Sequence, residues 1–174
     1  MEALRRLDAD GLVVIVPQVG CRVATYDACD ISNFFAVFAA FEGGIAGVPA
    51  ARRTEQDLQR LQEVHERIGS ICVEPDEVRR GHGYRLLNRE FHGVIHGMAR
   101  SIIEEISLRM WDLSDFLIST AGPSRPLGSA LERRHADHQS IYEALVSGDG
   151  AAARARMEEH VLDNVSLIRG DLSA

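Results

Sequence analysis

The chain has 174 residues, of which 19 are Lys or Arg and 26 are Asp or Glu, and its formal net charge is −7. This length predicts one main domain. The shares of hydrophobic residues (45%) and charged residues (26%) are close to those of globular proteins and exclude disordered and fibrous classes. The acidic balance argues against a bulk nucleic-acid binder, although it permits a small basic DNA-reading module attached to an acidic body.

The sequence has no pattern typical of a membrane span, a secretory signal or a cysteine-based site. No uninterrupted apolar run approaches the ~18 residues of a membrane span, and no apolar segment follows the first six residues. We therefore expect a cytoplasmic protein that makes no membrane contact and has no secretory signal. The cysteines Cys21, Cys29 and Cys72 are odd in number and widely spaced, which predicts neither a disulfide framework nor a thiolate zinc site.

Residues 1–25 form a first segment of mixed character. Leu4 and Leu7 lie at helical spacing, and Gly11 is suited to end a helix over residues 2–10. The β-branched run 12–16, the turn residues 17–20 and the extended pattern 21–24 predict a β-hairpin. We expect a short helix followed by this hairpin.

From residue 26 onward the signals are helical. Residues 54–57 and 101–104 resemble capping boxes, residues 122–126 read as a loop, and Gly148 and Asp149 are suited to end one helix and begin the next. Helices are predicted at 27–48, 54–68, 75–99, 101–120, 127–146 and 149–168, with Pro75 at a first helical position. Gly81 and Gly83 leave open an alternative in which the third of these helices is interrupted. Residues 26–174 are thus expected to form an all-α antiparallel bundle of six to seven helices.

Polar side chains on the apolar faces of three helices are the informative residues. Asn88 and His92 lie at spacing i, i+4 within one stripe, and His138 and His160 lie on or beside the apolar faces of the last two helices. Imidazole is a good ligand for several divalent metals, and an amide oxygen can add a further ligand. Hydrogen-bonded core histidines are the competing interpretation, and periodicity alone does not decide between the two.

The remaining residues support an enzyme less well. A metal-dependent hydrolase or hydratase is the alternative function, with Glu132 or Glu159 as its base, yet neither lies on the arc of the proposed ligands. Glu132 and His135 form a single ExxH motif, whereas di-iron bundles need two. His96 lies one turn after His92 and is expected to line the same cavity; His65, His82 and His135 are expected at the surface.

Several stretches resemble the FadR-type branch of the GntR transcription regulators. Residues 87–92 (LNREFH) are similar to its (D/N)xxFH motif, residues 137–141 (DHQSI) to its EHxxI motif, and residues 148–160 to its GDxxxAxxxMxxH segment. Residues 2–13 look like the end of the recognition helix of a winged helix-turn-helix, and residues 14–23 look like its wing. In this family the winged helix precedes an all-helical effector-binding domain, the FCD domain.

The resemblance implies a set of roles. Asn88, His92, His138 and His160 would ligate a divalent metal such as Zn, Ni or Mn, and His96 and Tyr84 would contact a small organic acid effector. A homodimer is implied, with Arg5, Arg6 and Arg22 in the remnant of the DNA-binding domain. Metal binding without catalysis is implied, so we expect no enzyme.

Two departures from the family pattern modify this expectation. The first two DNA-binding helices of the family would precede Met1, so DNA binding is expected only if a complete winged helix-turn-helix exists upstream, with the start assigned too late; a truncated gene is the alternative. Many members also carry an arginine in the first helix of the effector domain, where this chain has Asn33 followed by FFAV. This difference favours a less polar effector or one held chiefly through the metal.

Overall fold

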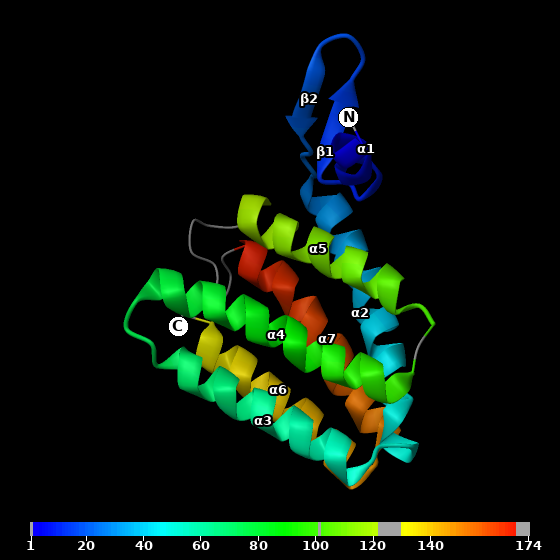
Figure 1. Cartoon of the computed structure of the whole chain (residues 1–174), viewed down its shortest axis with the longest axis vertical. Helices are drawn as coiled ribbons and strands as arrows, with labels where there is room; N and C mark the ends of the chain where they lie inside the picture. Colours follow the sequence, from blue (N-terminus) through cyan, green and yellow to red (C-terminus); the bar gives the residue numbers. More distant parts are fainter. Residues whose placement is uncertain (1, 101, 122–129, 170–174) are drawn as a thin grey trace.

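The computed structural model describes residues 2–100, 102–121 and 130–169. It begins with helix α1 (Glu2–Ala9), followed by strands β1 (Val13–Val16) and β2 (Gly20–Val23), which pair antiparallel with Val13 opposite Val23. The Asp8 carboxylate accepts a hydrogen bond from the backbone N–H of Ile15 at 3.0 Å and so ties α1 to the hairpin. Figure 1 shows this segment at one end of the molecule. The predicted helix and hairpin are confirmed, with ends that differ by one residue.

The rest of the described chain is a bundle of six long helices joined by short connections. They are α2 (Ala28–Gly47), α3 (Glu55–Cys72), α4 (Glu77–Ala99), α5 (Glu104–Ala121), α6 (Leu131–Ser147) and α7 (Gly150–Arg169), with the 3₁₀ turn η1 (Pro49–Ala51) after α2. Helix α7 packs along α2 and also contacts α6 and α5, while α3 packs against α4 and α6 (Figure 1). The expected all-α bundle with an N-terminal hairpin is confirmed.

Capping residues account for several helix ends. The Thr54 hydroxyl accepts from the N–H of Asp57 and the Asp57 carboxylate accepts from the N–H of Thr54, which is the predicted capping box of α3. Gly148 ends α6 with φ of 78°, in the left-handed region that glycine adopts without strain. Asp149 then accepts from the N–H of Ala152 at the start of α7.

Several predicted boundaries differ from the structure, among them the end of α3, which lies at Cys72 and not at residue 68. Helix α4 begins at Glu77 with Asp76 as its N-cap, and it continues through Gly81 and Gly83. Gly83 packs so closely on Ile71 of α3 that a Cβ at this position would lie 2.8 Å from that side chain. Helix α5 begins at Glu104, three residues later than predicted. Ser101, the predicted loop at 122–126 and the predicted start at 127 lie outside the described residues, and α6 is described from Leu131.

The core is formed by wholly buried side chains from facing helices, among them Phe35, Phe38, Leu61, Phe91 and Leu145. Residues 28–51 also form a helical segment long and apolar enough to cross a membrane, contrary to the expectation that no segment qualifies. Half of the most apolar stretch is buried inside the bundle, where α2 packs against α7. A core helix shows the same burial, so this segment is weak support for a span.

Candidate metal centre

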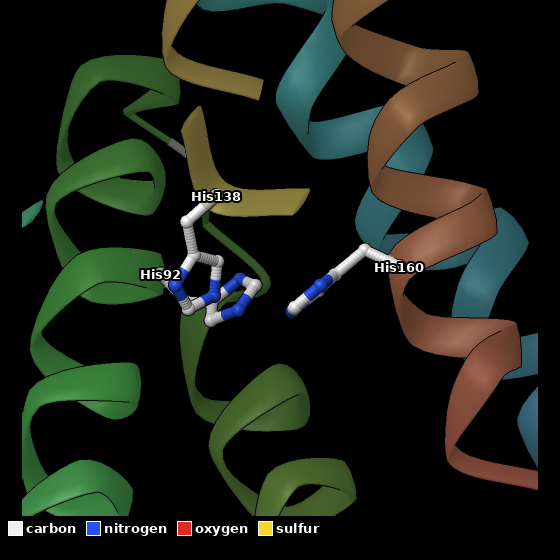
Figure 2. A group of neighbouring side chains, drawn as sticks. All are labelled: His92, His138 and His160. Carbon is white, nitrogen blue, oxygen red and sulfur yellow. The ribbon is translucent and has the colours of Figure 1, made fainter. Parts of the chain in front are cut away.

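Three imidazole rings converge at the centre of the bundle. His92 comes from α4, His138 from α6 and His160 from α7, and Figure 2 shows the rings turned toward one another. One nitrogen from each ring lies within 4.8 Å of the others, and none of the three residues is more than 1% exposed. The structure therefore brings together the three histidines that sequence periodicity placed on inward faces.

Aromatic side chains enclose these rings. Phe91, next to His92 on α4, stacks on His138 with ring centroids 4.3 Å apart. Trp111 of α5 lies against His92 at 4.3 Å, and Phe38 of α2 packs edge-on against Trp111 at 5.0 Å. The apolar walls keep water away from the imidazoles, which strengthens electrostatic interactions inside the site.

Burial keeps the three imidazoles neutral. It lowers the pKa of His92, His138 and His160 well below the usual value of 6.5, because charging a ring inside the core is costly. The Arg134 guanidinium lowers the pKa of all three further. A neutral imidazole with a free lone pair is the form that binds a metal.

The hydrogen-bonding state of these rings fits a metal better than a satisfied core. Both ring nitrogens of His92 and of His138 are buried without a hydrogen-bond partner among the described residues. Such orphaned groups are costly and rare in a core. His160 differs, since its Nδ1 lies 3.3 Å from a carboxylate oxygen of Asp137. A carboxylate at that position fixes the ring and raises its basicity toward a metal at Nε2.

Asn88 and Tyr84 lie beside the histidines on α4. Both side chains are buried, and the Tyr84 hydroxyl donates to Asn88 Oδ1 at 3.3 Å. They line a small cavity of about 20 Å³ together with Arg134 and Asn164, which is about the room that one water molecule needs. Asn88 as the fourth metal ligand and Tyr84 as an effector contact stay predictions.

His96 belongs to a separate hydrogen-bonded cluster. Its Nε2 lies 3.0 Å from Glu42 Oε2, and the Ser107 hydroxyl donates to Glu42 Oε1 at 2.6 Å. Glu42 is 1% exposed and its carboxylate also lies 3.9 Å from His92 Nδ1. His96 does share a small cavity with His92, as expected. Sequence reasoning missed Glu42, although a carboxylate in the middle of an apolar helix was a signal that it needs a buried partner.

Arg134 is a second residue that sequence reasoning missed. It is 3% exposed, one turn before His138 on α6, and its Nη1 donates to the backbone carbonyl of His160 at 2.7 Å. Its Nη2 lies 3.3 Å from His160 Nε2. The i, i+4 spacing to His138 was the available signal, because two such residues share a helix face.

The other candidate residues lie away from the site. His82 is exposed as expected, but the surface expectation for His65 is wrong: its ring is buried and stacks on the half-buried His135, 4.1 Å away, where α3 packs on α6. Glu132 and Glu159 are exposed, so the enzyme interpretation finds no base among them. The three arginines assigned to the DNA-binding remnant are all exposed: Arg5, Arg6 and Arg22.

Comparison with known proteins identifies the family. The sequence pattern of the FCD domain matches residues 33–163, well over half of the chain. The chain belongs to the FCD domain family. All four predicted ligands of this FCD domain lie inside the matched range, and residues 2–25 with the hairpin lie outside it.

The relatives are named as regulators. The chain is 27% identical over 146 residues to the HTH-type transcriptional regulator LutR of Bacillus subtilis (strain 168), covering 81% of this chain and 63% of that protein. It is 24% identical over 171 residues to the HTH-type transcriptional repressor GlaR of Escherichia coli (strain K12), covering 97% of this chain and 77% of that protein. These names agree with the resemblance to FadR-type GntR regulators and with the expectation that the FCD domain is not an enzyme.

Solved structures share the fold. E. coli McbR/YncC superposes with a TM-score of 0.78 at 18% identity, covering 98% of this chain and 83% of that one. Streptococcus agalactiae GntR superposes with a TM-score of 0.55 at 24% identity, covering 97% of this chain and 79% of that one. Because both matches cover nearly the whole chain, they include the N-terminal helix and hairpin.

Proposed function

We propose that this FCD domain is the sensing part of a transcription regulator, and that it binds a divalent metal at His92, His138 and His160 with Asn88 as a fourth ligand. The observation that carries the proposal is the set of three buried, neutral imidazoles, two of which have no hydrogen-bond partner for either nitrogen among the residues described. Imidazole suits Zn and Ni, the oxygen ligand from Asn88 also suits Mn, and availability in the cell decides among such ions.

The metal has a binding role in this proposal. When bound, it supplies the strongest local positive charge in a site shielded from water, and a small carboxylate effector is the ligand that such a charge favours. Asp137 would hold the His160 ring in place. The buried Glu42 carboxylate, 3.9 Å from His92 Nδ1, would offset part of the cationic charge.

Effector binding acts on DNA binding through the homodimer in this scheme. An effector that prefers one dimer arrangement shifts the population toward it and changes the spacing of the two DNA-reading units. Residues 1–25 form the end of the recognition helix and the wing, and Arg5, Arg6 and Arg22 would contact DNA only if a complete winged helix-turn-helix exists upstream. The regulators named among the relatives support this assignment. We place the protein in the cytoplasm.

Metal content is the test of the proposal. Plasma mass spectrometry of the purified protein, after loading with Zn, Ni or Mn and removal of free metal, is expected to find about one ion per chain. A His92→Gln/His138→Gln variant should lose that ion, whereas His82→Gln, which alters an exposed histidine of the same helix, should keep it. Equal metal content in all three proteins, or no metal in any of them, would refute the proposed site.

A second step tests the effector. Thermal-shift measurements on the metal-loaded protein with a panel of small carboxylates are expected to show stabilisation that chelation abolishes. Stabilisation of equal size in the double variant would mean that the carboxylate binds elsewhere.

A further inference from the structure

Arg134 is a buried cation with no carboxylate at ion-pair distance among the described residues. Its side chain is 3% exposed, and among the described residues it forms no ion pair. Its Nη1 donates to a backbone carbonyl, its Nη2 contacts a neutral imidazole, and its Nε has no partner within the described chain. The adjacent Arg133 is exposed and pairs with Asp163. The Asp137 carboxylate acts on Arg134 electrostatically, but it contacts His160 Nδ1 and not the guanidinium. Because buried charges are normally paired directly, the Arg134 guanidinium is suited to receive an anion.

The cavity beside Arg134 has the donors that an anion needs. The Asn88 amide group lines it together with the guanidinium, and so does the Tyr84 hydroxyl, which donates to Asn88 Oδ1. Asp115 also lines it, but the Arg89 guanidinium lies 2.8 Å from that carboxylate and neutralises it. The volume of about 20 Å³ admits one small polar group, such as one end of a carboxylate.

Arg134 also interferes with the metal site. Its Nη2 lies 3.3 Å from Nε2 of His160, which is the nitrogen left free for a metal when Nδ1 donates to Asp137. A guanidinium at that nitrogen opposes a divalent cation through like-charge repulsion in a dry site. A carboxylate placed between the two cations would remove the repulsion, and it matches the two parallel donors of the guanidinium fork.

We propose that Arg134 anchors the carboxylate of the effector, and that its engagement with this anion releases His160 Nε2, so that metal and carboxylate bind cooperatively. The inference rests on the proposed function and extends it to a specific residue. Helix α2 holds no arginine, so α6 supplies the cation that the family resemblance led us to look for on the first helix of the effector domain. The effector is accordingly acidic, and its affinity and that of the metal are reciprocally linked.

Calorimetric titration of Zn²⁺ into metal-free protein tests the coupling. The wild type, Arg134→Gln and the matched control Arg133→Gln are titrated at constant ionic strength with sodium chloride alone, with sodium acetate, or with the neutral analogue acetamide. In the wild type, acetate is expected to tighten Zn²⁺ binding roughly tenfold by cancelling the repulsion from Arg134, and acetamide is expected to leave it unchanged.

The two variants separate the coupling from a structural effect. Arg134→Gln should bind Zn²⁺ roughly tenfold more tightly than the wild type without acetate, because the opposing cation is gone, and acetate should add nothing. Arg133→Gln should behave as the wild type does. If Arg134→Gln fails to fold, Arg134→Lys keeps the charge but loses the planar fork, and its response to acetate should be smaller than that of the wild type.

The titrations distinguish failure of the proposed Arg134 role from failure of the proposed metal site. Zn²⁺ binding by the wild type with no response to acetate, or an unchanged acetate response in Arg134→Gln, overturns the role of Arg134 and leaves the metal site intact. Absence of Zn²⁺ binding by the wild type under all three conditions overturns the proposed function and this inference together.

Discussion

The pH dependence of stability follows from the burial of the three site histidines. Their pKa values lie well below 6.5 in the folded protein and return to about 6.5 in the unfolded chain. The unfolded chain therefore binds more protons below pH 6.5, and the stability contributed by the neutral rings is fully present above that pH and lost as the pH falls below it.

The size of the effect can be worked out for the metal-free protein. From about pH 7.5 to about pH 5.5, each histidine that stays neutral in the fold reduces the free energy of unfolding by about 1.4 kcal/mol, and three reduce it by about 4 kcal/mol. This is a large part of the ~5–15 kcal/mol of a typical domain. Burial lowers the pKa of His65 and His135 as well, and both act in the same direction.

Urea denaturation followed by circular dichroism, in chelator over this pH range, measures the effect. His138→Gln should lose about 1.4 kcal/mol of the pH-dependent change, since one titrating group is gone. His82→Gln should retain the full change, because His82 is exposed. A free energy of unfolding that stays flat between these pH values would refute the reasoning, as would an unaltered profile in His138→Gln.

Three further predictions concern the metal and the core. Asp137→Asn should weaken Zn²⁺ binding about 10- to 100-fold in calorimetric titration, because the carboxylate orients His160; an unchanged affinity would show that Asp137 plays no such part. Zn²⁺ at about 100 times its Kd should add about 2.7 kcal/mol to the free energy of unfolding, which raises the Tm by several degrees in a calorimetric scan; no shift would contradict binding to the folded state. Leu145→Ala should cost about 2–5 kcal/mol in urea denaturation because Leu145 is wholly buried, whereas Val37→Ala, at a 65% exposed position, should stay within about 0.5 kcal/mol; similar costs at both positions would contradict the described core.

Local signals were sufficient for most of the fold. The apolar periodicity of the helices and the capping residues at Thr54, Gly148 and Asp149 define where the helices lie and several of their ends. The predicted start of α4 was wrong because two neighbouring residues, Pro75 and Asp76, are both typical of helix starts. Asp76 caps the helix, since its carboxylate accepts from the first backbone N–H groups of α4. Helix α4 also continues through its two early glycines, and the close packing of Gly83 on Ile71 of α3 is a tertiary contact that helix propensity alone does not foresee.

The site was only partly predictable. Periodicity marks His92, His138 and His160 as inward-facing, but it does not say how three helices are rotated against one another, and that rotation brings the rings together. His65 was misassigned because the face of α3 that packs on α6 is wider than the apolar stripe suggests. Glu42 and Arg134 were missed because charged residues are mostly exposed. In this fold each lies beside a site histidine and is buried with it.

The metal site is most directly tested by anomalous diffraction from crystals of the Zn²⁺-loaded protein, collected on both sides of the zinc absorption edge. We expect one strong anomalous peak per chain between His92, His138 and His160, at the Zn–N distance of about 2.0–2.1 Å from one nitrogen of each ring. An anomalous peak only at other residues, with these three rings unliganded, would contradict it.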